Sequence, residues 1–89
     1  MTVRKRVRAH GRVQGVFFRD TLRRAAGREG VAGWAANRPD GTVEAVLEGD
    51  PEAVERLVEL CRDGPGHAHV ERLDVADEEP EGLAGFEIR

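Results

Sequence analysis

The spacing of apolar residues changes several times along the chain between a strand-like and a helix-like pattern. The order of these changes is the feature that most limits the fold. Apolar and polar residues alternate where a half-buried strand is expected, and apolar residues recur every three or four positions where an amphipathic helix is expected. The expected strands cover residues 3–9, 31–36, 42–48, 70–76 and 86–88, and the expected helices cover residues 19–28 and 51–63. The predicted order is therefore β-α-β-β-α-β, followed by one short strand.

The boundaries of the second helix and of the middle hairpin carry the clearest local signals. Asp50 suits the N-cap position, Pro51 the first helical position, and Gly64-Pro65 the end of the helix. The segment Arg38-Pro39-Asp40-Gly41 combines a fixed φ, a capping side chain and a glycine, which is typical of a tight turn. We therefore expect the second and third strands to form a hairpin.

This order predicts an α+β, ferredoxin-like sandwich, in which an antiparallel sheet carries two helices on one face. With 89 residues, of which 39% are hydrophobic and 35% charged, the chain can fill one core, and we expect a single domain over residues 1–89. The other face of the sheet, which carries Arg4, Arg6 and Arg8, is expected to meet water. Because this fold serves enzymes, RNA binders and sensors alike, it does not decide the function.

Charge and composition exclude several classes of protein. A net charge of −3 argues against affinity that comes from neutralising many nucleic-acid phosphates. No apolar run approaches the roughly 20 residues of a membrane helix, and the N-terminus lacks the apolar stretch of a signal peptide. Cys61 is the only cysteine, so an internal disulfide is impossible. We expect a cytoplasmic protein that does not bind nucleic acid or membranes, and a monomer, since no large apolar surface is indicated.

The segment from Gly11 to Asp20 joins the first strand to the first helix and is the most informative part of the chain. A glycine-containing loop before a helix N-terminus can direct several backbone N–H groups at one anion. Arg19, at the start of the helix, is opposed by the helix dipole, and a bound phosphate would resolve that conflict. The alternative is a surface arginine whose partner is Asp20.

Two motifs in this sequence resemble those of the acylphosphatase family. Gly11-Arg12-Val13-Gln14-Gly15-Val16-Phe17-Phe18-Arg19 is similar to the signature loop of that family, and Gly33-Trp34-Ala35-Ala36-Asn37 with Asp40-Gly41-Thr42-Val43-Glu44 is similar to its second signature. The resemblance extends over essentially the whole chain. It implies hydrolysis of the carboxyl-phosphate anhydride of a small-molecule acyl phosphate, in a monomer that needs no metal and no other cofactor.

The resemblance also implies roles for particular residues. Arg19 matches the phosphate-binding arginine of the family, and Asn37 matches the asparagine that orients the attacking water. The phosphate-binding loop is matched by the backbone amides of Val13, Gln14, Gly15, Val16 and Phe17. The sequence departs from the family pattern at Ala35-Ala36, where a larger apolar residue and a basic one are more frequent, and at Arg89, which no terminal aromatic residue follows.

Other functions remain as alternatives to a free-standing acylphosphatase. No Ser-His-Asp or Cys-His pairing, no Walker-type lysine and no acidic cluster for Mg²⁺ is evident in the pattern. An RNA-binding module shares the fold, acylphosphatase-like domains begin large hydrogenase-maturation proteins that handle carbamoyl phosphate, and a sensor would bind the anion without turnover. The length of 89 residues, beginning at Met1 and ending past the last strand, favours the free-standing enzyme.

The remaining distinctive side chains are expected to have structural roles. His10 is predicted on the polar face of the first strand, and His67 and His69 at the surface where a strand begins. Phe17, Phe18 and Trp34 are expected in the core or in a pocket wall, and Cys61 on the buried side of the second helix.

Overall fold

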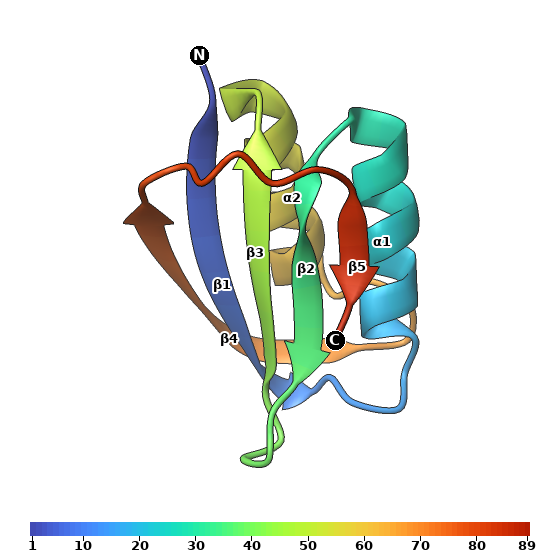
Figure 1. The fold of residues 1–89 in the computed structure, drawn as a ribbon. Coiled ribbons are helices and arrows are strands. Elements are labelled where there is room, and N and C mark those ends of the chain that lie inside the picture. The colour runs from blue at the N-terminus through green and yellow to red at the C-terminus, as the bar shows by residue number, and fades with distance from the viewer.

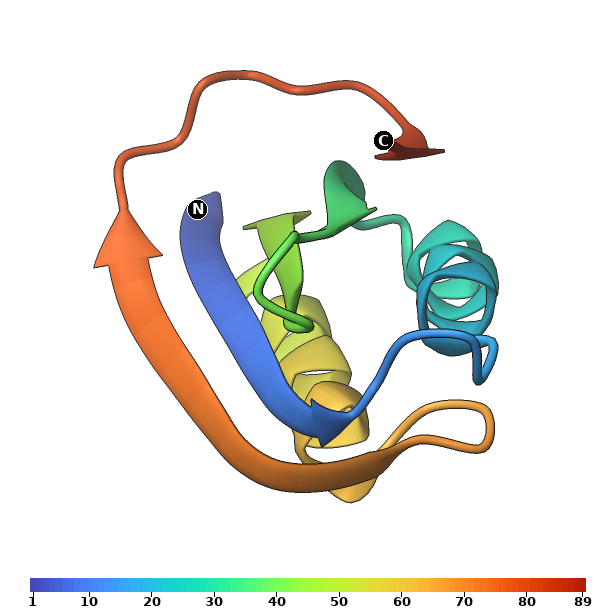
Figure 2. The ribbon, with the colours of Figure 1, turned by 90° about the horizontal axis from the view of Figure 1, so that it is seen from below.

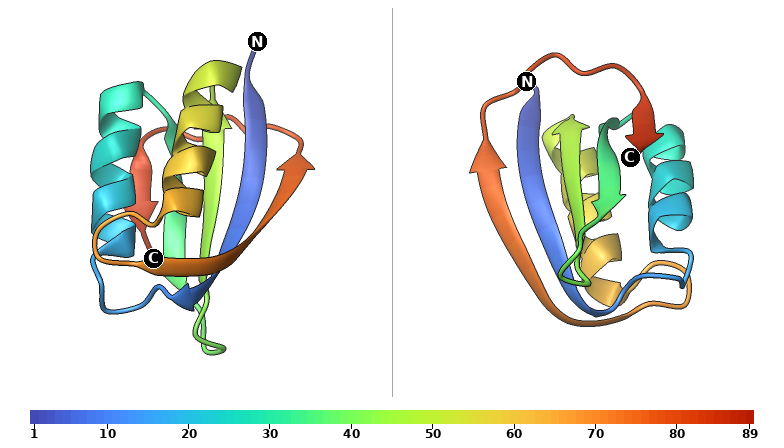
Figure 3. Two further views of the ribbon diagram at one scale, coloured as in Figure 1. Left: turned by 180° about the vertical axis from the view of Figure 1, so that it is seen from behind. Right: turned by 60° about the horizontal axis from the view of Figure 1, so that its bottom comes forward.

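A computed structural model describes residues 1–89 and shows two helices packed on one face of a five-stranded sheet (Figures 1 and 3). The elements are β1 (Val3–Arg12), α1 (Phe18–Glu29), β2 (Ala32–Asn37), β3 (Val43–Gly49), α2 (Pro51–Asp63), β4 (His69–Glu78) and β5 (Phe86–Ile88). The strand order in the sheet is β4-β1-β3-β2-β5. The expected ferredoxin-like sandwich is therefore confirmed, and neither helix is long and apolar enough to span a membrane.

The predicted helix ends and hairpin agree with the structure. The Asp50 carboxylate accepts a hydrogen bond from the Glu52 N–H at 3.2 Å, which caps α2. The chain between β2 and β3 turns at residues 38–41, where the Gly41 N–H donates to the Arg38 carbonyl at 3.0 Å. The two strands pair antiparallel on either side of that turn.

Two strands are longer than their hydrophobic patterns indicate. β1 continues to Arg12 because a shift in register between His10 and Gly11 lets it stay paired with β4 beyond the regular alternation. β4 continues through Asp77 and Glu78, which we expected in an acidic loop. Cations of β1 pair with both carboxylates: Lys5 lies 2.7 Å from Asp77, and Arg4 lies 2.9 Å from Glu78.

The sheet is mixed, whereas the pattern predicts an antiparallel one. Four strands pair antiparallel, but β5 pairs parallel with β2, so that Ala35 lies opposite Ile88. The segment of residues 79–85 runs from one edge of the sheet to the other and brings β5 to the far edge in the direction of β2 (Figures 1 and 2). The parallel pairing follows from this long crossing, which local periodicity does not indicate.

The main core lies between the helices and the sheet. Its largest fully buried side chains include Phe18 and Leu22 of α1, Leu47 of β3 and Val54 of α2. Cys61 is also fully buried there, and burial raises the pKa of its thiol to about 12. This cysteine is therefore a small core residue, as expected, and not a thiolate at neutral pH.

The opposite face of the sheet meets water only in part: Arg6 and Arg8 are about a third exposed, whereas Arg4 is buried near residues 79–85, which corrects the expectation for that residue. Arg4 and Glu48 are only 4% and 3% exposed. The Glu48 carboxylate accepts backbone hydrogen bonds from Glu81, Gly82 and Leu83 at 2.9, 2.9 and 2.8 Å. This carboxylate therefore ties the crossing segment to the sheet.

Trp34 lies on this same face and is 7% exposed. It forms a second, small cluster with Ala36 and Val46, with Leu83 packed against it. The guanidinium groups of Arg6, Arg38 and Arg89 lie 5.4, 5.5 and 4.8 Å from its ring centre. Trp34 is thus a core residue of the outer face rather than a wall of a pocket.

The carboxylates of this network have lowered pKa values. Burial by itself would raise the pKa of Glu48, but the three backbone N–H groups and Arg4 outweigh it and lower that pKa. Hydrogen bonds from Arg6 and Arg4 lower the pKa of Glu78 to about 2. Because both folded-state pKa values lie below the unfolded ones, the stabilisation is present above about pH 4.5 and is lost as the pH falls through the lowered pKa of each group, which for Glu78 is about 2.

We predict that Glu48→Gln lowers the free energy of unfolding at pH 7 by about 1–3 kcal/mol, because the amide group cannot accept all three N–H bonds and leaves Arg4 short of a partner. Chemical denaturation measures this loss. Glu59→Gln, on the exposed face of α2, should change stability by less than about 0.5 kcal/mol. The difference between Glu48→Gln and wild type should shrink below pH 4.5, and an unchanged difference down to pH 2 would contradict the assignment.

Candidate active site

A pocket of about 290 Å³ opens between the β1–α1 loop, the end of β2 and the end of β5. Its lining residues are Val13, Gly15, Phe17, Phe18, Arg19, Asp20, Asn37 and Ile88. The pocket brings together Arg19 and Asn37, the two side chains that the sequence singles out from separate motifs. It is also lined by Val13, Gly15 and Phe17 of the predicted loop, whereas Gln14 and Val16 bond to neighbouring segments outside the pocket.

The backbone N–H groups of residues 13–17 have no hydrogen-bond partner within the protein. Gly15 and Phe17 both adopt left-handed conformations, with φ of 71° and 65°, which turn the chain tightly before α1. α1 begins at Phe18, and no side chain caps its N-terminus. Free N–H groups beside an uncapped helix N-terminus form an environment that stabilises an anion.

Arg19 stands in this environment without a carboxylate partner, since none of the ion pairs of the chain includes it. Asp20 pairs instead with Arg23 at 2.6 Å and Arg24 at 3.0 Å, on the outer side of α1. The alternative in which Asp20 neutralises Arg19 is therefore wrong. The guanidinium is half-buried and remains available to an anion in the pocket.

Asn37 ends β2 and contributes an unsatisfied acceptor. Its Oδ1 atom is buried and has no hydrogen-bond partner in the protein. A buried amide oxygen without a partner is costly unless a water molecule or ligand donates to it. Its place in the pocket makes it an acceptor for a water or for a protonated group next to the anion.

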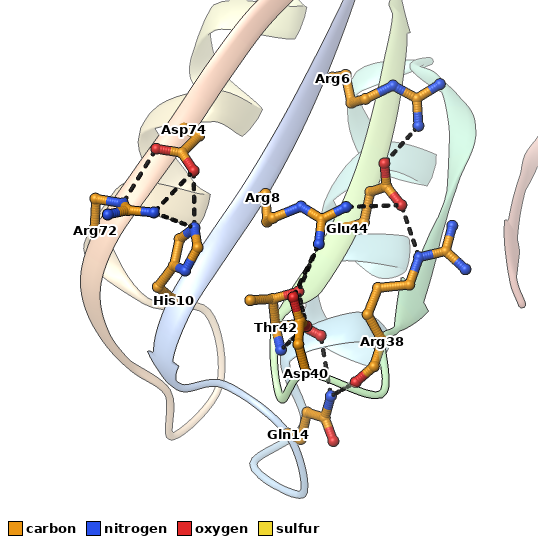
Figure 4. A network of polar contacts seen from close by, with 10 residues as sticks. All are labelled: Arg6, Arg8, His10, Gln14, Arg38, Asp40, Thr42, Glu44, Arg72 and Asp74. Atoms are coloured by element: carbon orange, nitrogen blue, oxygen red, sulfur yellow. Dashed lines mark hydrogen bonds and ion pairs between the residues drawn. The ribbon is translucent and has the colours of Figure 1, made fainter.

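Gln14 and Val16 do not line the pocket but hold its loop in place. The Gln14 side-chain amide donates to the carbonyls of Arg38 and Thr42 at 2.8 and 3.0 Å, which joins the loop to the β2–β3 turn (Figure 4). Val16 is buried, and its carbonyl accepts from the His67 N–H at 2.8 Å. The loop is therefore fixed from both sides without using its own N–H groups.

Gly66 is a residue of this site that sequence reasoning missed. Its φ is +68°, and a Cβ there would lie 2.5 Å from the Val16 carbonyl oxygen and 3.0 Å from the Phe17 carbonyl carbon. The loop before β4 thus packs directly against the backbone of the β1–α1 loop. The Gly64-Pro65-Gly66 run is the available signal, but nothing in the pattern says which segment it approaches.

The three histidines lie outside the pocket lining. The His10 ring interacts with Asp74 through Nε2 at 2.8 Å, on the outer side of β1 and β4 (Figure 4). The His67 ring meets the Phe17 ring edge-on, with centres 6.0 Å apart. His69 is the first residue of β4 and is exposed. These positions agree with the expected surface roles.

Fold and pocket together define a class of protein: small α+β domains in which a pocket at the N-terminus of a helix brings together an arginine and an amide side chain. The family model described as Acylphosphatase matches residues 5–88. The chain belongs to the acylphosphatase family, and the hydrolase class expected from the sequence is confirmed.

Individual relatives agree with this family over nearly the full chain. An acylphosphatase of Gloeobacter violaceus is 60% identical over 86 residues, which cover 92% of each chain. An acylphosphatase of Thermococcus kodakarensis is 58% identical over 94% of this chain and 97% of its own. The crystal structure of the Bacillus subtilis acylphosphatase is 36% identical and superposes with a TM-score of 0.93 over 100% of this chain and 99% of its own.

We predict that Gly66→Ala lowers both stability and activity, because its Cβ would push the Val16 and Phe17 backbone out of place. The matched control is Gly30→Ala, which has a similar φ of +69° and no atom within 4 Å of the added Cβ. Gly30→Ala should cost only about 1–2 kcal/mol for its left-handed backbone and keep kcat/KM. Denaturation and acyl phosphate turnover test the pair. Equal effects of the two substitutions on kcat/KM would contradict the contact between the loops.

Proposed function

We propose that this chain hydrolyses acyl phosphates without a metal ion, with the amides of residues 13–17 and Arg19 holding the phosphoryl group and Asn37 orienting the attacking water. One observation carries the proposal. The loop of residues 13–17 has five consecutive N–H groups without partners, and three of its residues line the same pocket as an arginine without a carboxylate and an asparagine with an unsatisfied amide oxygen.

The phosphoryl group would be stabilised by donors that are already in position. Negative charge on its oxygens is met by the loop N–H groups, by the N-terminus of α1 and by the Arg19 guanidinium, whose paired donors suit two phosphate oxygens. The chain contains no group of three or more His, Cys, Asp or Glu residues arranged to hold a metal ion. Arg19 and the amides are therefore the groups we assign to charge stabilisation, which is the main task in phosphoryl transfer.

The hydrolytic step needs only a positioned water. Asn37 Oδ1 accepts a hydrogen bond from this water and aims its oxygen at phosphorus. The new P–O bond forms as the bond from phosphorus to the acyl oxygen breaks, and the carboxylate leaves with the bonding electrons. The water proton passes to a phosphoryl oxygen, because the only carboxylate of the pocket, Asp20, is paired with two arginines.

One alternative, the RNA-binding module, fits the structure less well, and the other two are separated from the enzyme by activity measurements. An RNA-binding sheet stacks bases on exposed aromatic rings, whereas Trp34 is buried under three guanidinium groups that have acidic neighbours. A non-catalytic sensor would bind phosphate but would not release it from an acyl phosphate. Carbamoyl phosphate, assayed in parallel, separates the hydrogenase-maturation type of domain from a general acylphosphatase.

We further propose that the protein acts as a monomer on a small molecule. Only four large hydrophobic residues are exposed, and two of them line the pocket, so they do not form a large apolar surface for a partner chain. The cytoplasmic location expected from the sequence stays a prediction.

Arg19→Ala should lower kcat/KM for benzoyl phosphate by about 10²–10³-fold, raising KM and lowering kcat, because its contact serves both the bound substrate and the transition state. Turnover is followed as phosphate release in EDTA. Arg28→Ala is the control, since Arg28 is an exposed residue of the same helix without an ion pair. Loss of wild-type activity in EDTA would contradict the metal-free mechanism, and full activity of Arg19→Ala would remove Arg19 from the site.

Asn37→Ala should act mainly on kcat, with a loss of about 10²-fold, since the water it orients is used only in the chemical step. Its affinity for inorganic phosphate, measured by calorimetry, should stay within about threefold of wild type, because Arg19 and the amides still hold the anion. In Arg19→Ala that affinity should fall together with activity. A wild-type kcat in Asn37→Ala would exclude the role in orienting water.

A further inference from the structure

Exposed apolar side chains gather at the mouth of the pocket. Only four large hydrophobic residues of the chain are well exposed: Met1, Phe17, Val75 and Ile88, at 94%, 67%, 39% and 36%. Met1 is the chain terminus and Val75 lies on β4, but Phe17 and Ile88 line the same pocket. Phe17 and Ile88, which are 71 positions apart in the sequence, thus expose apolar surface at one site, although burial of either side chain would be favourable.

Phe17 is held at this mouth in an uncommon backbone conformation. It is the only non-glycine residue of the chain with a positive φ, at 65°. Its ring meets the His67 ring edge-on, with centres 6.0 Å apart. An aromatic residue that is both strained and exposed beside a binding pocket indicates a functional use of the ring.

Ile88 reaches the pocket from the other side, through the parallel pairing of β5 with β2. Ile88 lies opposite Ala35, and the next residue, Arg89, donates its N–H to the Ala35 carbonyl at 2.8 Å. Ala35 is fully buried on the helix-facing side of the sheet, so Ile88 faces α1 and the pocket rather than the outer face.

The pocket is larger than a phosphoryl group requires. A phosphoryl group with its bridging oxygen has only five non-hydrogen atoms, and because they are covalently bonded they occupy much less space than five water molecules at about 30 Å³ each. The pocket measures about 290 Å³. Its polar part consists of the loop amides, Arg19 and Asn37, and the remaining space faces Phe17 and Ile88.

We propose that this enzyme selects acyl phosphates whose acyl group is apolar, and that Phe17 and Ile88 form the two walls that contact this group. The inference rests on the proposed function, because the phosphoryl end must occupy the loop for the acyl group to lie between these walls.

The test is a series of acetyl, butyryl and hexanoyl phosphate, whose leaving carboxylates have nearly equal basicity, so that kcat/KM reports contact with the acyl chain. In the wild type, kcat/KM should rise by about tenfold from acetyl to hexanoyl phosphate, the order expected for added methylenes in an apolar site. Ile88→Thr should remove most of this ratio. Ile88→Val should keep an intermediate value.

Val75→Thr is the matched control, because Val75 is a comparably exposed strand residue outside the pocket. It should leave the hexanoyl to acetyl ratio as in wild type. Thermal unfolding of each variant checks that the ratio is measured on folded protein, and a ratio within one variant is insensitive to the fraction folded.

Failure of the inference and failure of the proposed function give different results. If the wild type hydrolyses acetyl phosphate but kcat/KM does not rise with chain length, apolar selection is wrong and the hydrolase stands. An equal loss for all three substrates in Ile88→Thr would also overturn it, since Ile88 would then only support the fold. Absence of turnover with every acyl phosphate would overturn both.

Discussion

The loop of residues 13–17 must keep a fixed shape although its five backbone N–H groups have no partner inside the protein. Much of the remaining structure serves to fix this loop through other atoms. Free N–H groups are costly in a folded chain, and a loop usually gains its order by using them. Here the order comes from other atoms. The Gln14 side chain bonds the β2–β3 turn, the Val16 carbonyl accepts from His67, and Gly66 packs on the loop backbone.

The outer face of the sheet supports the same site from a distance. Glu48 is buried with Arg4 and accepts three N–H groups of the segment that leads into β5. That segment brings β5 beside β2 and so places Ile88 at the pocket. A buried ion pair adds little net stability by itself, but it specifies where a chain segment lies, because a displaced segment would leave the charges without partners. The charged network thus determines one wall of the pocket.

Local arrangement also explains how an acidic protein can have a pocket with a positive electrostatic environment. The net charge is −3, yet the pocket has one cation without a partner, free N–H groups and a helix N-terminus. Its one carboxylate, Asp20, is neutralised by Arg23 and Arg24. At short range these groups outweigh the overall charge, which salt screens over about 8–10 Å.

The sequence by itself determined the order of elements, the caps and turns, and the two motifs that name Arg19 and Asn37, because these depend on residues close together in the chain. It predicted a water-exposed outer face, since Arg4 and Glu48 are charged, but it could not show that they bury each other under residues 79–85. The parallel direction of β5, the approach of Gly66 to the loop and the place of Ile88 in the pocket were decided only by the tertiary structure. Each of these contacts joins segments far apart in sequence, and its energy depends on packing and charge pairing that no local pattern encodes.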